Sequence, residues 1–285
     1  MGCKGESFSP FFIILSLAMQ QFDHLLTTRP HDISTVFVSD LHLSSDTPAL
    51  NQAFLALIKD LYVLPNLQSL YILGDWLDSW IGDDDYLTLS NDKKARHFLT
   101  PILNTLKTLS TKTAIYVMHG NRDFAIRQRL CDTFHGTLIK ELHFLTLSNG
   151  TTIRLEHGDR LCTDDKAYQR YRKIIQNPVI SWLILKQPLA YRQRLAHKIK
   201  AKSHSDKHQK SATIMDINSD MVAKTMKTCD ILLHGHTHRP AVHTLGDKKR
   251  MVLGDWRYID DKVQAVIGAV DSDGVGLWVF DWFVK

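Results

Sequence analysis

Short apolar runs recur along the chain, and each is followed by a turn of similar composition. The runs at 35–39, 69–73, 113–118, 152–156 and 231–234 are rich in Val, Ile and Leu. Runs of this length between polar residues predict buried β-strands. The residues that follow them read DLH, GD, HGNRD, HGD and GHTH. Because open α/β folds bind ligands beyond the carboxyl ends of their strands, the pattern predicts a site built from these turns.

Helical periodicity fills the intervals between several of these runs. The stretch PALNQAFLALIKDLYVL at 48–64 has apolar residues at helical spacing and stops at Pro65 and Asn66. Residues 92–109 predict a second helical region. Near the C-terminus, KVQAVIGAV and VGLWVFDWF predict an antiparallel strand pair. The chain is therefore expected to be an α/β protein.

The interval at about 164–226 contains no run that resembles a strand. Its stretch NPVISWLILKQPLAYRQRLAHKIKAK interleaves Leu and Trp with Lys and Arg on both sides of Pro188. We expect two short amphipathic helices there, forming a cap over the strand ends. The prediction is thus a domain at 34–285 with a helical cap inserted at about 164–226.

The charge of the chain is unevenly distributed. The formal net charge is +5, but the segment from Lys166 to Lys210 holds twelve Lys and Arg against one acidic residue, Asp206. The rest of the chain holds 23 basic and 29 acidic residues. A basic segment on an otherwise acidic protein indicates an anionic partner, such as a nucleic acid, an acidic lipid headgroup or a phosphorylated substrate.

Cysteine usage and hydropathy exclude two classes of protein. Cys3, Cys131, Cys162 and Cys229 are scattered and form no CxxC pair, so neither a zinc knuckle nor a disulfide framework is indicated, which favours the reduced cytosol. No stretch approaches the 18 or more apolar residues of a membrane span.

Residues 1–33 precede the first predicted strand and are expected to form an N-terminal extension. The apolar stretch at 11–19 is followed by no small-x-small cleavage site, and Glu6 breaks the myristoylation pattern. One interpretation is that Met19 is the true start and residues 1–18 are not native. The other is that the extension is native and disordered.

The turns after the strands carry side chains that suit divalent metal ions. These residues are Asp40, His42, Asp75, Asn121, His157, His236 and His238. Each motif alone is a weak signal, but five such turns in one order make coincidence improbable. Asp, His and Asn ligands without a thiolate suit Mn²⁺, Fe²⁺ or Zn²⁺. A shared carboxylate can hold two ions roughly 3.5–4 Å apart, which suits in-line attack on phosphorus.

The order D-x-H, GD, GN, H, GHxH resembles that of the calcineurin-like metallophosphoesterases. The longer motifs LGDWLDSWIGDDD, HGNRDF, HGDRLCTDD, SATIMDIN and HGHTHRPAVH are similar to those of one family within them, the UDP-2,3-diacylglucosamine hydrolases of lipid A biosynthesis. The similarity runs from about Val36 to the C-terminus. It implies a sandwich of two mixed β-sheets flanked by helices, with a helical cap insertion.

The resemblance also implies which residues hold metal ions. One ion is expected on Asp40, His42, Asp75 and His238, and the other on Asp75, Asn121, His157 and His236, with Asp75 as the bridge. The family favours manganese, so two Mn²⁺ ions are the expected cofactors. The residues expected to act in catalysis are Asp75, Asn121, Arg122 and His236.

Substrate contacts are carried over from the family where its motifs match. They are Asn121, Arg122, Asp165, Ser203, Lys210 and His236. Lys207 stands where the family has Asn and is left out of the site. The implied reaction is attack of water on the α-phosphorus of UDP-2,3-diacylglucosamine, giving UMP and 2,3-diacylglucosamine 1-phosphate (lipid X). The implied location is peripheral, on the anionic cytoplasmic face of the bacterial inner membrane, and we expect a monomer without a nucleic-acid partner.

Arg122 replaces a histidine that protonates the leaving group in many enzymes built on this plan. A sugar 1-phosphate is already a stable anion and needs little protonation, so a fixed guanidinium suits a diphosphate substrate. The alternative is an ordinary salt bridge from Arg122 to Asp123 or Asp159. Asp165 has an alternative role as a helix cap. We expect the acids of WIGDDD, at 83–85, to form a solvated loop or a helix start.

Two other functions stay open from the sequence. The basic cap of a related two-metal phosphodiesterase or nuclease would grip nucleic-acid phosphates. The Leu- and Trp-rich cap and the absence of a spread aromatic surface argue against that function. A binding module that has kept the fold without catalysis would be expected to have lost ligands, and none is missing here.

Overall fold

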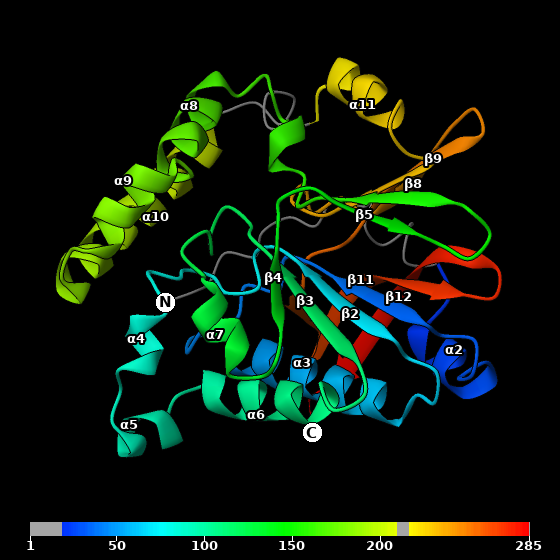
Figure 1. The fold of residues 1–285 in the computed structure, drawn as a ribbon, viewed down its shortest axis with the longest axis horizontal. Coiled ribbons are helices and arrows are strands. Elements are labelled where there is room, and N and C mark those ends of the chain that lie inside the picture. The colour runs from blue at the N-terminus through cyan, green and yellow to red at the C-terminus, as the bar shows by residue number, and fades with distance from the viewer. Residues whose placement is uncertain (1–18, 210–216, 285) are drawn as a thin grey trace.

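The structure is a computed structural model that describes residues 19–209 and 217–284, with the backbone alone for residues 200–209. Two β-sheets pack face to face, with helices on the outer faces (Figure 1). The first sheet has the order β10 (Arg257–Ile259), β11 (Lys262–Asp271), β1 (Thr35–Val38), β2 (Ser69–Leu73), β3 (Ala114–Met118) and β4 (Thr137–Ile139), and β12 (Gly274–Phe283) pairs with β11. The second has the order β5 (His143–Thr146), β6 (Thr152–Leu155), β7 (Ile231–His234), β9 (Lys248–Val252) and β8 (Ala241–Leu245).

Both sheets are mixed, as the expected fold class requires. Strands β1 to β4 run parallel, whereas β11 pairs antiparallel with β1. In the second sheet β6, β7 and β9 are parallel, and both edge strands are antiparallel to their neighbours. Every residue of β1, β2 and β7 is buried, which explains why these segments read as continuous apolar runs.

Two apolar clusters cover the faces of the first sheet. One lies between the sheets and joins Phe37, Tyr71 and Leu73 to Leu155 and Leu233. The other lies under the helices on the outer face. The helices of the main body are α2 (Phe22–Thr28), α3 (Pro48–Val63), α4 (Asp84–Leu87), α5 (Asn91–Ala95), α6 (Leu99–Leu109) and α7 (Gln128–Asp132). The sandwich therefore holds the carboxyl ends of β1, β2, β3, β6 and β7 in fixed positions.

Helix α2 lies before residue 34, within the stretch expected to form an extension. Phe22 and Leu25 are fully buried in the outer apolar cluster, and Gln21 forms a bridge with Val279 of β12. This part of the extension packs as part of the domain, because its apolar residues cover the end of the first sheet. Residues 1–18 lie outside the described residues.

The expected cap is helical, and two helices flank Pro188 as expected, preceded by a third at 166–175. Helices α8 (Lys166–Ile175), α9 (Pro178–Leu185) and α10 (Leu189–Gln209) form an arm beside the strand ends (Figure 1). Pro188 precedes α10, which continues for 21 residues. The following helix, α11 (Ser219–Met226), packs on the second sheet instead, since Val222 and Met226 contact Leu232 of β7 in one apolar cluster.

The helices of the described part of the chain are all too short or too polar to cross a membrane.

Candidate active site

The seven candidate metal ligands all come from loops at the carboxyl ends of strands. Asp40 and His42 follow β1, Asp75 follows β2, Asn121 follows β3, His157 follows β6, and His236 and His238 follow β7. The first sheet supplies four of them and the second sheet supplies three. The structure thus brings together the residues that the sequence predicted for the metal site.

The backbone at the site is held in a conformation that side chains seldom adopt. Asp40, His42, Asp75, His236 and His238 have positive φ values of 54, 50, 50, 70 and 55°. Left-handed backbone is uncommon for residues other than glycine, and it clusters at functional sites. Here five of the seven candidate ligands share it, so the loops orient these side chains at a cost in local stability.

Glycines in the same motifs provide room for the ligand side chains. A Cβ atom on Gly120 would lie 2.1 Å from Oδ1 of Asp75, and one on Gly235 would lie 2.2 Å from Oδ2 of Asp40. Gly74 has a φ of 86° and packs against Gly120. The glycines of GD, HGN and HGH are therefore required by the close approach of the loops.

One group of ligand atoms surrounds Asp40. The atoms offered by Asp40, His42 and His238 all lie within 4.8 Å of one another. Oδ1 of Asp40 is 3.3 Å from Nε2 of His238, and the Nε2 atoms of His42 and His238 are 3.5 Å apart. Ser39 Oγ and the backbone N–H of His236 both donate to Oδ2 of Asp40, which fixes the carboxylate.

A second group lies beside the first. Asp40, Asp75 and His157 also offer atoms within 4.8 Å of one another. Nε2 of His157 is 3.7 Å from Oδ1 of Asp75 and 3.1 Å from Oδ1 of Asn121. Nδ1 of His236 is 3.0 Å from the same oxygen of Asn121. The other oxygen of Asp75 lies 3.9 Å from Nδ1 of His42, so Asp75 stands between the two groups.

The donor set fits a divalent metal ion. Oδ1 of Asp40 and Nδ1 of His42 are buried and have no hydrogen-bond partner among the described residues. Buried polar atoms are normally paired, so two ligand atoms without a hydrogen-bond partner in one site fit a bound cation. Oxygen and imidazole ligands without thiolate are typical of Mn²⁺, Fe²⁺ or Zn²⁺.

The electrostatics of the site favour the neutral ligand form of two of its four histidines. Burial lowers the pKa of His42 and of His236 to about 3, so both imidazoles are neutral near pH 7. A neutral imidazole offers a lone pair to a cation. Burial opposes protonation of the other two, but Asp75 raises the pKa of His157 to about 9 and Asp255 raises that of His238 to about 10. Burial opposes ionisation of Asp40, but its ion pair with the His238 ring holds the Asp40 pKa below its usual range.

Arg122 points to the acids of the preceding loop. Its Nη1 donates to Oδ1 of Asp78 at 3.0 Å, and its Nε lies 3.9 Å from Oδ2 of Asp75. The backbone N–H of Arg122 donates to Oδ1 of Asp75 at 2.8 Å. Arg122 therefore forms a salt bridge, as the alternative interpretation held, but its partner is Asp78 and neither Asp123 nor Asp159. Asp123 instead accepts hydrogen bonds from the backbone N–H groups of Trp76 and Gly120.

Three residues around the site were not singled out from the sequence. Asp255 lies 3.1 Å from Nδ1 of His238 and follows β9 in the motif VLGD, a strand-end signal like that of Asp75. Asp78 holds Arg122. Tyr168, from cap helix α8, stacks on the ring of His236 with 6.1 Å between centroids, and its hydroxyl donates to Asp159. No pattern in the sequence indicated this contact from the cap.

The remaining predicted substrate contacts lie in the cap. Asp165 caps α8, since its side chain accepts the backbone N–H of Tyr168 at 3.0 Å. Ser203 and Lys207 fall in the part of α10 whose side chains are not described, and Lys210 lies outside the described residues. The helix start expected at 83–85 is confirmed, since α4 begins at Asp84, but Asp83 is buried and not solvated.

We predict that Asp255→Asn weakens metal binding. Loss of the carboxylate that orients a metal-bound histidine typically costs about 10- to 100-fold in metal affinity. Asp255 also pairs with Arg257 at 2.7 Å, which fixes its position against His238. Titration of the metal-free protein with Mn²⁺ should show a Kd raised by that factor. Asp247→Asn, in an exposed turn, is the control, and an unchanged Kd for Asp255→Asn would refute the orienting role.

Comparison with known proteins agrees with the fold and the site. The family model for calcineurin-like phosphoesterases matches residues 33–240. Fold and site together thus define a calcineurin-like phosphoesterase, a class that works with divalent metal ions, and the chain is a hydrolase. The expected sandwich of two mixed sheets flanked by helices is confirmed.

Relatives narrow the class further. A UDP-2,3-diacylglucosamine hydrolase from Shewanella piezotolerans is 40% identical over 225 residues, covering 78% of this chain and 90% of that protein. The enzymes of the same name from Shewanella pealeana and Pseudomonas fluorescens are 39% and 38% identical, over 85% and 87% of this chain and 96% and 95% of their own. The chain belongs to the UDP-2,3-diacylglucosamine hydrolase family.

Proposed function

We propose that the protein hydrolyses the diphosphate of UDP-2,3-diacylglucosamine, with water attacking the α-phosphorus, to give UMP and 2,3-diacylglucosamine 1-phosphate. The observation that supports it most is the pair of adjoining ligand groups that share Asp40, with Asp75 of the second group 3.9 Å from His42 of the first. Relatives that share 38–40% of their residues over most of the chain carry the name of that activity.

The seven candidate ligands would hold two Mn²⁺ ions. Asp40, His42 and His238 form one set, and Asn121, His157 and His236 form the other. Asp75 would serve both sets. When bound, divalent ions lower the pKa of water and neutralise phosphoryl oxygens. The protein contributes fixed loops, so little reorganisation is required as charge develops on the phosphate.

Arg122 would bind the diphosphate. Its guanidinium is one-quarter exposed, and the acids beside it keep it at the edge of the ligand groups. A planar fork that never loses its charge suits two phosphoryl oxygens. Asn121 and His236 adjoin the same space and would contact the substrate as well as the metal. Asp165 and Tyr168 bring the first cap helix to this side.

One assay with three substrates tests the proposal. Purified protein with Mn²⁺ is given UDP-2,3-diacylglucosamine, single-stranded DNA or an aryl phosphodiester, and UMP and nucleotide release are followed. We expect UMP from the first substrate and loss of that activity after EDTA treatment. Absence of UMP would refute the proposal, and nucleotide release from DNA would favour a nuclease. No product from any of the three substrates would indicate a binding module without catalytic activity.

We also propose that the cap rests on the anionic surface of a membrane. Exposed apolar side chains gather on α8 and α9: Ile174, Val179, Trp182 and Leu183 are 49–65% exposed. Exposed cations, including Lys173 and Lys186, lie among them. A basic helix with an apolar face binds at an anionic lipid interface. Such a surface would give a peripheral protein direct access to a substrate with two acyl chains.

Vesicle binding tests this location. The double change Trp182→Ser and Lys186→Ser should lower partitioning onto phosphatidylglycerol vesicles at least about tenfold. One cation near an anionic surface is worth about 1 kcal/mol, and burial of a large apolar side chain contributes roughly 1.5–3 kcal/mol. Phe144→Ser, an exposed apolar residue on β5, is the matched control. Equal partitioning of the double variant and the wild type would refute the proposal.

A further inference from the structure

The cap is joined to the main body by a buried arginine. The side chain of Arg192, in the first turn of α10, is 3% exposed. Its guanidinium donates two hydrogen bonds to the carboxylate of Asp84, the Nη1 bond to Oδ1 measuring 2.8 Å. Nη1 also donates to the carbonyl of Ile81 at 2.6 Å, and Nε to that of Gln187 at 2.9 Å. A bidentate pair of this kind fixes orientation as well as distance.

The residues around Asp84 leave room for the side chain of Arg192. Gly82 has a φ of 135°, and a Cβ atom there would lie 2.3 Å from Nη1 of Arg192. Asp83, one residue on, accepts hydrogen bonds from Nε1 of Trp80 and from the backbone of Arg127 and Leu130. The motif WIGDDD thus binds the cap through Asp84, and it binds the loop after β3 through Asp83.

A second contact repeats this arrangement. Arg127, in the loop that begins with Asn121, donates from Nη2 to the hydroxyl of Ser181 in α9. Its Nη1 donates to the carbonyls of Phe124 and Ile126, so the arginine is held before it reaches the cap. The segments after β2 and β3, which supply candidate metal ligands, are therefore hydrogen-bonded to α10 and α9, and the loop after β6 is hydrogen-bonded to α8 through Asp159.

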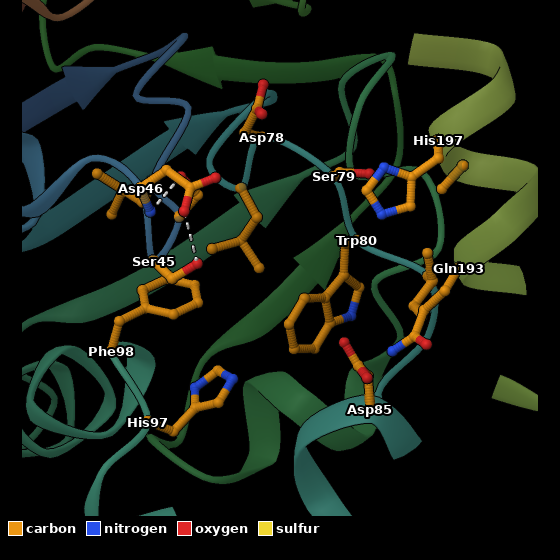
Figure 2. Close-up of a pocket in the computed structure, with 15 residues that line it drawn as sticks. Ser45, Asp46, Asp78, Ser79, Trp80, Asp85, His97, Phe98, Gln193 and His197 are labelled. Carbon is orange, nitrogen blue, oxygen red and sulfur yellow. Dashed lines mark hydrogen bonds between the residues drawn. The ribbon is translucent and has the colours of Figure 1, made fainter. Parts of the chain in front are cut away.

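A cavity of about 220 Å³ lies between the cap and the main body. Figure 2 shows Gln193 and His197 of α10 on one side and Ser45, Asp46 and Phe98 on the other. The loop wall includes Asp78, which holds Arg122, and Trp80 to Ile81, whose carbonyl binds Arg192. Gln193 directly follows Arg192, so the position of that arginine sets the position of the cap wall.

We propose that the Arg192–Asp84 pair, supported by Arg127 and Ser181, is a latch that holds the cap at the distance from the metal loops at which a lipid-linked substrate is bound. These are positioning residues, since none of them contacts the candidate ligands. The inference rests on the proposed function for its substrate, but the latch itself is a property of the protein alone. Breaking it should weaken substrate binding and leave the metal centre intact.

The variants are chosen to preserve the fold. Asp84→Asn keeps the shape of the side chain and removes its charge, Arg192→Lys keeps the charge and removes the fork, and Ser181→Ala removes one hydroxyl. Arg194→Gln is the matched control, because Arg194 lies on the same helix and is exposed. We expect Asp84→Asn and Arg192→Lys to raise KM for UDP-2,3-diacylglucosamine at least about tenfold, the factor expected for losing a hydrogen bond to a charged group.

Three readouts separate the latch from a general structural role. The kcat for the lipid substrate and the turnover of a soluble aryl phosphodiester should stay within about twofold of the wild type, since the latch residues contact none of the candidate metal ligands and a change in binding alone raises KM without lowering kcat. Amide exchange at 189–199 should be faster in both latch variants and unchanged in Arg194→Gln. Ser181→Ala should also raise KM and the amide exchange rate, but by smaller factors.

Two results would overturn the latch. One is that Asp84→Asn has the same KM and the same amide exchange rates as the wild type. The other is an equal loss on both substrates, which would place the defect at the metal centre or in the fold as a whole. If the wild-type protein releases no UMP, the proposed function fails, and amide exchange then decides the latch by itself.

Discussion

Asp75→Asn is expected to lower turnover of UDP-2,3-diacylglucosamine by more than about 100-fold, beyond the 10- to 100-fold that loss of a residue supporting a ligand costs. Asp75 is almost fully buried and lies within 3.7 Å of His157 on one side and 3.9 Å of His42 on the other. An amide of the same shape has no charge and cannot serve two cations at once. The loss should therefore appear in kcat and in the number of Mn²⁺ ions bound per chain.

The fold should survive this change. Asn tolerates left-handed backbone better than most residues, so the φ of 50° at position 75 adds little strain. The Asn side-chain oxygen can still accept the backbone N–H of Arg122. Asp92→Asn, an exposed acid in α5, controls for the loss of one charge. A variant with wild-type Tm, kcat and two bound ions would refute the assignment of Asp75.

Arg122→His should lower turnover of the UDP-sugar about 100-fold, within the range of roughly 10²–10³ for losing one group that stabilises developing charge. The same change should lower turnover of an activated aryl phosphodiester less than tenfold. The difference arises because the guanidinium is proposed to bind the second phosphate, which the aryl substrate lacks. Its contact with Asp78 at 3.0 Å places it beside the candidate ligands without making it one of them.

Arg122→Lys gives an intermediate test, because it retains a positive charge without the planar fork. Its turnover of the UDP-sugar should lie between that of the wild type and that of Arg122→His. Kinetics on both substrates at saturating Mn²⁺ measure the ratio directly. An equal loss of turnover on the two substrates would contradict the proposal that Arg122 selects a diphosphate.

The central strands and their site could be predicted from the sequence because they are buried on both sides. Residues 69–73 and 231–234 are buried throughout, mostly apolar, and match β2 and β7 to the residue. Strands β5, β8 and β9 were missed, since their exposed or half-buried positions carry Lys, His and Thr. Helix α2 was missed because only Phe22 and Leu25 of its seven residues are fully buried.

The metal loops were predictable because each of them directly follows a strand. The order of the ligand motifs along the chain follows the order of these strands. Contacts that depend on the cap were not predictable. Arg192 and Asp84 are 108 residues apart, and nothing in a segment with twelve cations indicates which of its arginines are buried. The same holds for Tyr168, whose stacking on His236 depends on where α8 is placed.

The most direct test of the proposed reaction is hydrolysis of UDP-2,3-diacylglucosamine in water enriched with ¹⁸O, followed by mass spectrometry of both products. Attack on the α-phosphorus predicts one ¹⁸O atom in UMP and none in 2,3-diacylglucosamine 1-phosphate. Label in the sugar phosphate instead would contradict the proposed site of attack, and the absence of both products would contradict the function itself.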